Sequence, residues 1–174
     1  MKPLVFNSTP LIYLTKVGLS TVFEGLVGEK FTSPTVKKEV VEEGKRKGIS
    51  DAIVLGKLFE NSVFKVRKPK DNEVFSRLSE TRGLHVADAE VLALAWECDG
   101  VAVVDDEVAK KTAKVYGIFY AGTPYILVRA VDEGIISKDA AKQAVKDMIS
   151  VGWRCSVESY AKIMEILDRI LRSV

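Results

Sequence analysis

Three carboxylates, those of Asp88, Asp105 and Asp106, stand out in one short stretch of high apolar content between Gly83 and Lys114. Asp88 lies in the first turn of an expected helix, and Asp105 and Asp106 directly follow an expected buried strand. Two adjacent acids without a neighbouring base repel each other unless a cation lies close by. Carboxylate oxygens are the donors that Mg²⁺ and Mn²⁺ prefer in proteins. We therefore predict that these three residues belong to one divalent-metal site.

The helical spacing around Asp88 favours a functional role for this residue. Positions 91, 92 and 95, which share its helix face, are Val, Leu and Ala, so its carboxylate points along a buried stripe. A carboxylate there needs a cation or hydrogen-bond donors to offset its desolvation. The alternative is structural, because an acid in a first turn also interacts favourably with the helix dipole. Glu90 lies on another face of the same helix and is not expected to join the site.

The two residues of the acidic doublet are not equivalent. One of them can act as the N-cap of the following helix, and Asp105 is a candidate for that structural role. Asp106 is therefore the better single candidate for metal binding and catalysis, with Asp105 close beside it. The doublet as a whole is expected to be functional.

Short apolar segments separated by helical patterns define the elements that must position these acids. Strands are expected at residues 4–6, 30–32, 63–66, 101–104 and 118–120. Helices are expected at about residues 10–17, 19–27, 35–43, 52–61, 71–80, 86–97, 106–116, 123–131, 138–149 and 157–171. This alternation predicts an α/β fold, a three-layer sandwich with a mostly parallel five-stranded sheet.

Local signals mark several of the helix boundaries. Ser8 or Thr9 can cap the first helix, and Ser137 can cap the helix that follows it. Gly44 is expected to end the helix that begins after Ser33, which leaves the basic residues 45–47 in a loop.

In a parallel sheet, the loops at the carboxyl ends of the strands form the binding crevice. Asn7 follows the first strand and the acidic doublet follows the strand at residues 101–104. Both are therefore expected to open onto the same edge.

Length and composition limit the classes of protein that fit. A chain of 174 residues, 47% of them hydrophobic, is expected to form one domain over residues 1–174, with C-terminal helices from about residue 137. No segment approaches the roughly 20 apolar residues of a membrane span, and the first residues lack a signal-peptide pattern. We therefore expect a cytoplasmic protein. Cys98 and Cys155 match no zinc or redox spacing, and the single histidine, His85, disfavours a His-rich zinc centre or a Ser-His-Asp triad.

The net charge of +2 hides an uneven distribution. Residues 30–70 carry eleven Lys or Arg against five acids, a balance of +6, whereas residues 71–109 carry two against ten, a balance of −8. An acidic pocket beside a basic rim suits metal-dependent chemistry on a polyanion. The alternative is that solvated helix faces simply differ in sign.

Several segments together resemble the PIN domain, a nuclease fold that many toxin–antitoxin ribonucleases share. The opening Asn-Ser-Thr-Pro-Leu-Ile at residues 7–12 is similar to the Asn-Ser-Ser-Pro-Leu-Ile pattern of an uncharacterised archaeal and bacterial branch. The segment at residues 84–95 resembles the family's central helix, and residues 104–110 resemble its fourth motif. Residues 122–136 resemble the segment after its last strand, so the resemblance covers about residues 4–136.

The resemblance implies a flavodoxin-like fold and a Mg²⁺- or Mn²⁺-dependent ribonuclease. By position, Glu39 matches the family's second acidic ligand, Asp88 the third and Asp106 the fourth. Ser8 or Thr9 would match the hydroxyl beside the first acid. In this sequence Asn7 stands in place of that first acid. Its amide oxygen can still coordinate Mg²⁺, but the replacement removes one negative charge from the site.

The predicted function is hydrolysis of RNA phosphodiester bonds, leaving a 5′-phosphate and a 3′-hydroxyl as the resemblance suggests. Its partners would be RNA, a small antitoxin protein and a second copy in a homodimer, with no membrane. Basic residues near Glu39 are expected to hold the RNA backbone, namely Lys37, Lys38, Lys45, Arg46 and Lys47. One alternative is a catalytically silent RNA- or partner-binding module. Another is a phosphoacceptor receiver domain, although its doublet would follow the first strand rather than the fourth.

Overall fold

Five short strands form one fully parallel sheet in the order β3-β2-β1-β4-β5. The structure, a computed structural model, describes residues 1–70 and 72–170. The strands are β1 (Leu4–Phe6), β2 (Lys30–Thr32), β3 (Lys65–Val66), β4 (Val101–Val103) and β5 (Phe119–Ala121). Central β1 pairs with β2 and with β4, so that Leu4 lies between Lys30 and Val101. The predicted α/β class and parallel sheet are confirmed.

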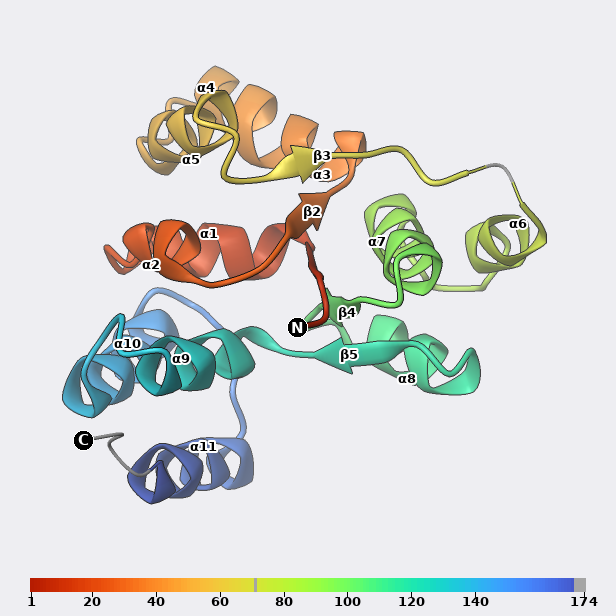
Figure 1. The fold of residues 1–174 in the computed structure, drawn as a ribbon. Helices are drawn as coiled ribbons and strands as arrows, with labels where there is room; N and C mark the ends of the chain where they lie inside the picture. The colour runs from red at the N-terminus through yellow and green to blue at the C-terminus, as the bar shows by residue number, and fades with distance from the viewer. Residues whose placement is uncertain (71, 171–174) are drawn as a thin grey trace.

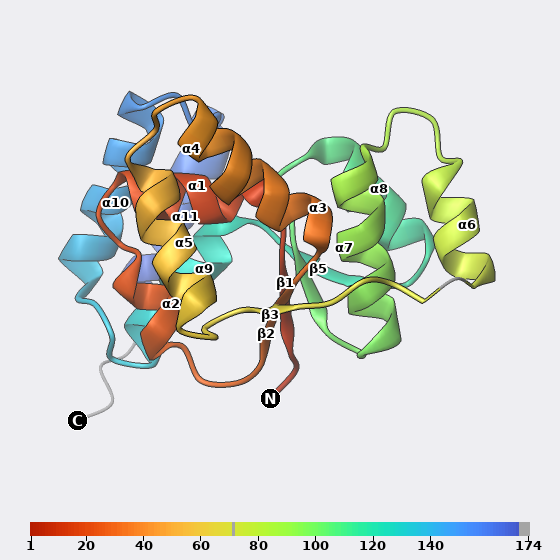
Figure 2. The same cartoon turned by 90° about the horizontal axis from the view of Figure 1, so that it is seen from above.

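Helices cover both faces of the sheet and make a three-layer arrangement (Figures 1 and 2). On one face lie α6 (Glu73–Ser79), α7 (Val86–Glu97) and α8 (Glu107–Val115). On the other lie α1 (Ser8–Lys16), α2 (Thr21–Gly25), α5 (Asp51–Glu60), α9 (Thr123–Asp132) and α10 (Lys138–Ser150). The predicted helix α7 has the bounds expected from the sequence, and Ser137 caps α10 through a hydrogen bond from the Ala140 amide. The start expected at residue 71 lies outside the described residues.

The helix that begins after Ser33 does not end at Gly44 as predicted. It runs through α3 (Pro34–Lys37), the π-helix η1 (Lys38–Glu43) and α4 (Gly44–Arg46), so Lys45 and Arg46 are helical rather than in a loop. Gly44 has helical dihedral angles, and a Cβ atom there would meet the Cβ of Ala52 at 2.6 Å. This glycine is therefore explained by the close approach of α5, not by the end of a helix.

The core lies on both sides of the sheet and includes a cluster of aromatic rings. Phe6, Phe23 and Phe64 contact one another edge to face with centroids 5.3–5.6 Å apart. Helix α7 is buried from Ala87 to Ala95, because it packs against β1, β4 and the neighbouring helices α3, α6 and α8. This burial explains why α7 is apolar around most of its circumference.

The final helix, α11 (Val157–Arg169), packs on α9 and α10 at the outside of the molecule. Ile163 and Leu167 of this helix are buried against the core, while its predicted end at Leu171 lies outside the described residues. Of the helices within residues 1–70 and 72–170, none is long and apolar enough to cross a membrane.

Candidate functional site

The predicted site residues lie around the carboxyl-terminal edge of the sheet. Asn7 follows β1, the helix that carries Glu39 follows β2, and the acidic doublet follows β4. Asp88 comes to the same edge from the first turn of α7. The expectation that the residues after β1 and β4 open onto one edge is therefore confirmed.

Asn7 lies at the centre of this region and contacts Asp88 directly. Its amide nitrogen donates to Asp88 Oδ1 at 2.5 Å, and its Oδ1 accepts a hydrogen bond from the Ser8 backbone N–H at 2.8 Å. The second bond fixes the orientation of the amide, so the nitrogen and not the oxygen faces the carboxylate. Asn7 is also the N-cap of α1, which corrects the expectation that Ser8 or Thr9 caps this helix.

Asp88 is a buried carboxylate with a perturbed pKa. It is 3% exposed, and its pKa is raised to about 6. Desolvation is the main cause, and the negative charges of Asp106 and Glu39 raise the pKa further. His85 opposes this shift through its charge and through a backbone hydrogen bond. Asp106 and Glu39 therefore both lie near enough to Asp88 to affect its ionisation.

Glu39 approaches the site from the π-helix and contacts the residue beside Asn7. Its Oε2 accepts a hydrogen bond from the Ser8 hydroxyl. Single π-turns inside α-helices occur frequently at functional sites. The side chain of Glu39 is half-buried, unlike that of an ordinary surface glutamate.

Asp106 is the N-cap of α8, which corrects the alternative that Asp105 has this role. Its Oδ1 accepts hydrogen bonds from the backbone N–H groups of Val108 at 2.8 Å and Ala109 at 2.9 Å. Within the described residues, its Oδ2 accepts no hydrogen bond. Asp106 can therefore cap the helix with one oxygen and offer the other to a ligand.

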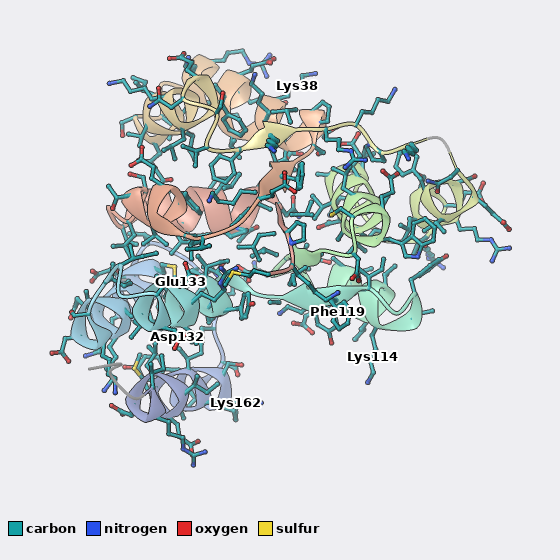
Figure 3. The ribbon with its side chains drawn as sticks, viewed as in Figure 1. Lys38, Lys114, Phe119, Asp132, Glu133 and Lys162 are labelled. Carbon is teal, nitrogen blue, oxygen red and sulfur yellow. The ribbon has the colours of Figure 1, made fainter. Side chains whose placement is uncertain are left out.

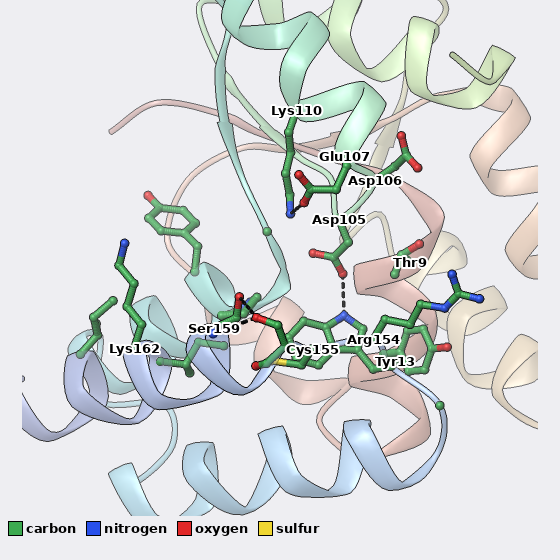
Figure 4. Close-up of a pocket in the computed structure, with 18 residues that line it drawn as sticks. Thr9, Tyr13, Asp105, Asp106, Glu107, Lys110, Arg154, Cys155, Ser159 and Lys162 are labelled. Carbon is green, nitrogen blue, oxygen red and sulfur yellow. Dashed lines mark hydrogen bonds and ion pairs between the residues drawn. The ribbon is translucent and has the colours of Figure 1, made fainter. Parts of the chain in front are cut away.

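Asp105 has a different environment from its neighbour. Its Oδ1 accepts from the Thr123 backbone N–H at 2.7 Å, and its Oδ2 accepts from the Thr123 hydroxyl at 2.6 Å and from Trp153 Nε1 at 2.9 Å (Figure 4). These three bonds join β4 to the start of α9 and to the loop before α11. They account for a half-buried carboxylate without any metal. No local sequence pattern pointed to Thr123 or Trp153, because both lie far from Asp105 along the chain.

The predicted RNA-binding residues divide into two groups along α3, η1 and α4. Lys37 and Lys38 lie next to Glu39 on the same helix, whereas Lys45, Arg46 and Lys47 lie at its far end. The ammonium of Lys37 lies 5.7 Å from the ring centroid of Phe59. At least one of the predicted RNA-binding residues therefore contacts a side chain of the protein itself.

A groove with a volume of about 1100 Å³ opens beside the acidic residues. Thr9, Asp105 and Asp106 line one part of it, and α8, the start of α9, the loop before α11 and α11 itself line other parts (Figure 4). The groove also contains basic and aromatic side chains that the sequence did not connect with the site, namely Tyr13, Lys110, Tyr125, Arg154 and Lys162.

The donor set fits Mg²⁺ or Mn²⁺ in its chemistry. Asp88, Glu39 and Asp106 offer carboxylate oxygens, and the raised pKa of Asp88 shows a buried acid that lacks a sufficient counter-charge. Within residues 1–70 and 72–170, however, no three His, Cys, Asp or Glu side chains lie close enough together to hold an ion as placed. Glu39 and Asp88 instead hold neutral donors, Ser8 and Asn7.

One of two comparisons with known proteins identifies a family, and it agrees with this fold. No curated protein matches the sequence. A family model described as a PIN domain matches residues 3–169, which include every predicted site residue. The chain therefore belongs to the PIN-domain family.

Proposed function

We propose that this protein is a divalent-metal-dependent endoribonuclease. The observation that carries the proposal is the approach of Asp88, Glu39 and Asp106 to one sheet edge, with Asp88 buried and its pKa raised to about 6. PIN-domain proteins are in general nucleases. A cation among these oxygens would offset the desolvation and repulsion that otherwise disfavour the ionised form of Asp88.

Each site residue would have a distinct role in RNA cleavage. Asp88, Asp106 and Glu39 would hold Mg²⁺ or Mn²⁺, which when bound supplies an activated water and neutralises charge on the phosphate. Asn7 would orient Asp88 through its amide, and Ser8 would orient Glu39. Thr9, which lines the groove beside Asp106, would contact substrate. Asp105 would fix the backbone from which Asp106 projects.

Cleavage of a labelled RNA with Mn²⁺ tests the proposal. Asp88→Asn preserves the size of the side chain and its hydrogen bond with Asn7, and it should abolish cleavage while the fold stays intact. Glu90→Gln is a matched control, because Glu90 is another buried carboxylate of α7, 9% exposed, that belongs to no predicted ligand set. Unchanged cleavage by Asp88→Asn would contradict the assignment.

A second candidate is a PIN-fold module that binds RNA or a partner without cleaving. The contact between Asn7 and Asp88 favours it, because a neutral amide replaces an acid and already contacts one proposed ligand. Calorimetric titration with Mn²⁺ separates the two candidates. Binding that Asp88→Asn removes supports the nuclease, and no binding at millimolar Mn²⁺ supports the silent module. A toxin role, a small antitoxin, a homodimer and a single domain over residues 1–174 remain part of the proposal.

A further inference from the structure

We infer that the groove between α8 and α11 binds the single-stranded RNA segment next to the cleavage site, with Arg154 and Lys162 contacting phosphates and Tyr125 stacking on a base. This inference rests on the proposed nuclease function and adds the path of the substrate. Asp106 and Thr9 line the groove and also belong to the proposed active site. An RNA strand that lies in the groove would therefore reach the proposed metal-binding residues directly.

The charges in the groove favour a polyanion despite the nearby acids. Asp105 accepts three hydrogen bonds, and Glu107 forms an ion pair with Lys110 at 2.9 Å. Two of the acids that line the groove therefore have partners in the protein. Arg154 and Lys162 are exposed, and neither forms an ion pair with any residue that the structure describes. Both are available to phosphate oxygens.

The positions of these cations suit an extended backbone. Arg154 lies in the loop before α11, on the side of Thr9 and Asp106, whereas Lys162 lies on α11 at the other side of the view (Figure 4). Phosphates held at both places would direct the strand along the groove toward Asp106. A single contact point would not define a direction.

Aromatic side chains in the groove favour a single strand over a duplex. Tyr125 at the start of α9 is 38% exposed, and it lines the groove together with the half-buried Tyr13. Bases in a duplex are already stacked and cannot use such rings, whereas unpaired bases stack on them. The combination of free cations and an exposed ring is the pattern by which proteins bind single strands without reading sequence.

Binding of a fluorescent uridine decamer, measured by anisotropy in EDTA, tests the groove without requiring cleavage. Arg154→Ala and Lys162→Ala should each weaken binding and lower the slope of log K against log salt by about 0.7, the value for one phosphate contact on a single strand. Tyr125→Leu should weaken binding at least about fivefold, the lower limit for a lost stacking contact, and Tyr125→Phe should preserve it. Circular dichroism confirms that each variant is folded.

Lys114→Ala is the matched control, because Lys114 is an exposed lysine of α8 that lies away from α11 (Figure 3). It should bind the decamer like the wild type. Unchanged affinity and salt slope in the Arg154 and Lys162 variants would overturn the inference. So would a larger loss in Lys38→Ala, which would place the strand along η1 instead. Loss of a protein partner without loss of RNA binding would also overturn it, in favour of a peptide-binding groove.

Failure of the groove and failure of the nuclease proposal are distinguishable. If groove-dependent binding is observed but no Mn²⁺-dependent cleavage occurs, the chemistry is wrong and the binding site stands. If cleavage depends on Asp88 but not on Arg154 or Lys162, the binding site is wrong and the chemistry stands.

Discussion

The side-chain amide of Asn7 donates a hydrogen bond to Asp88 across the edge of the sheet, at 2.5 Å from nitrogen to Oδ1. Asn7 stands where the resemblance to PIN domains places the first acidic ligand. In the metal-free protein, the amide of Asn7 partly replaces a cation, because its partially positive N–H hydrogens face a buried carboxylate. The same residue caps α1 through its oxygen. Asn7 therefore stabilises the metal-free protein and at the same time occupies one oxygen of a proposed ligand.

Asn7→Asp should exchange stability for metal affinity. The substitution keeps the cap but replaces the donor to Asp88 with a second carboxylate, which should lower the metal-free free energy of unfolding by roughly 2–3 kcal/mol. Mn²⁺ should then raise the melting temperature of the variant more than that of the wild type. Thermal unfolding in EDTA and in Mn²⁺ measures both effects.

The control for this experiment is Asn72→Asp. Asn72 caps α6 through its oxygen, and its amide nitrogen donates to Glu97 Oε1 at 3.3 Å, so it has the same two kinds of contact outside the site. This variant should also lose stability in EDTA but gain no additional response to Mn²⁺. Equal responses of the two variants to Mn²⁺ would show that Asn7 does not adjoin a metal site.

The raised pKa of Asp88 predicts a pH-dependent effect of Asp88→Asn on stability. The native pKa is about 6 and the ordinary pKa of an aspartate is 3.8, so between these pH values the native state binds more protons than the unfolded state. The stability of the wild type should therefore fall as pH rises through this window, by at most about 3 kcal/mol from this group. The variant lacks the titrating group. The free energy of unfolding of the variant minus that of the wild type should be near its minimum at pH 4 and largest above pH 6.

Denaturant unfolding at a series of pH values in metal-free buffer measures this difference. An advantage that does not change with pH would contradict the assigned shift. Glu90→Gln serves again as the control, because it removes a carboxylate from the same helix. The difference in free energy of unfolding between the wild type and Asp88→Asn is expected to grow as pH rises toward about 6.

The sequence was sufficient to predict the helices and strands and the edge of the sheet at which the acidic residues meet. Helix α7 was predicted with its observed bounds because its apolar run and its ends are local properties. Asp88 was identified because a carboxylate among buried positions is visible in helical spacing. Glu39 required the family resemblance, since its own neighbours in sequence are those of a surface residue.

The sequence could not assign roles that tertiary contacts decide. The local capping pattern made Asp105 the candidate for the helix cap, whereas Asp105 binds Thr123 and Trp153 and Asp106 caps the helix. Gly44 was interpreted as a helix end because glycine commonly has that role, yet its reason is the nearby Ala52. The groove was missed because its walls come from segments that are far apart in the chain.

Glu133→Ala should destabilise the fold strongly without affecting metal binding. Arg129 and Glu133 form an ion pair with side chains that are 10% and 13% exposed, and Glu133 Oε2 also accepts from the Val27 backbone N–H at 2.8 Å. Removing the acid leaves a buried guanidinium without its partner, which costs about 3–5 kcal/mol. Glu165→Ala removes an exposed pair with Arg169 at the same spacing and should change stability by less than about 1 kcal/mol. Chemical denaturation compares the two, and similar losses would contradict the prediction.

Asp105→Asn and Asp106→Asn should separate structural from metal-binding roles within the doublet. Asn caps a helix as well as Asp does, so Asp106→Asn should keep the stability of the metal-free protein to within about 0.5 kcal/mol while it loses Mn²⁺ binding and cleavage. Asp105→Asn brings an amide nitrogen against donors from Thr123 or Trp153, which should cost about 1–3 kcal/mol. Its response to Mn²⁺ should remain.

Thermal unfolding with and without Mn²⁺, together with calorimetric titration, measures both properties on each variant. Trp153 provides an additional signal, since loss of its hydrogen bond to Asp105 should change its fluorescence in the Asp105 variant only. If Asp105→Asn instead keeps its stability and loses Mn²⁺ binding, Asp105 is the ligand and Asp106 only a helix cap. That result would place the metal near Thr123, because Asp105 could bind the ion only by giving up its three hydrogen bonds.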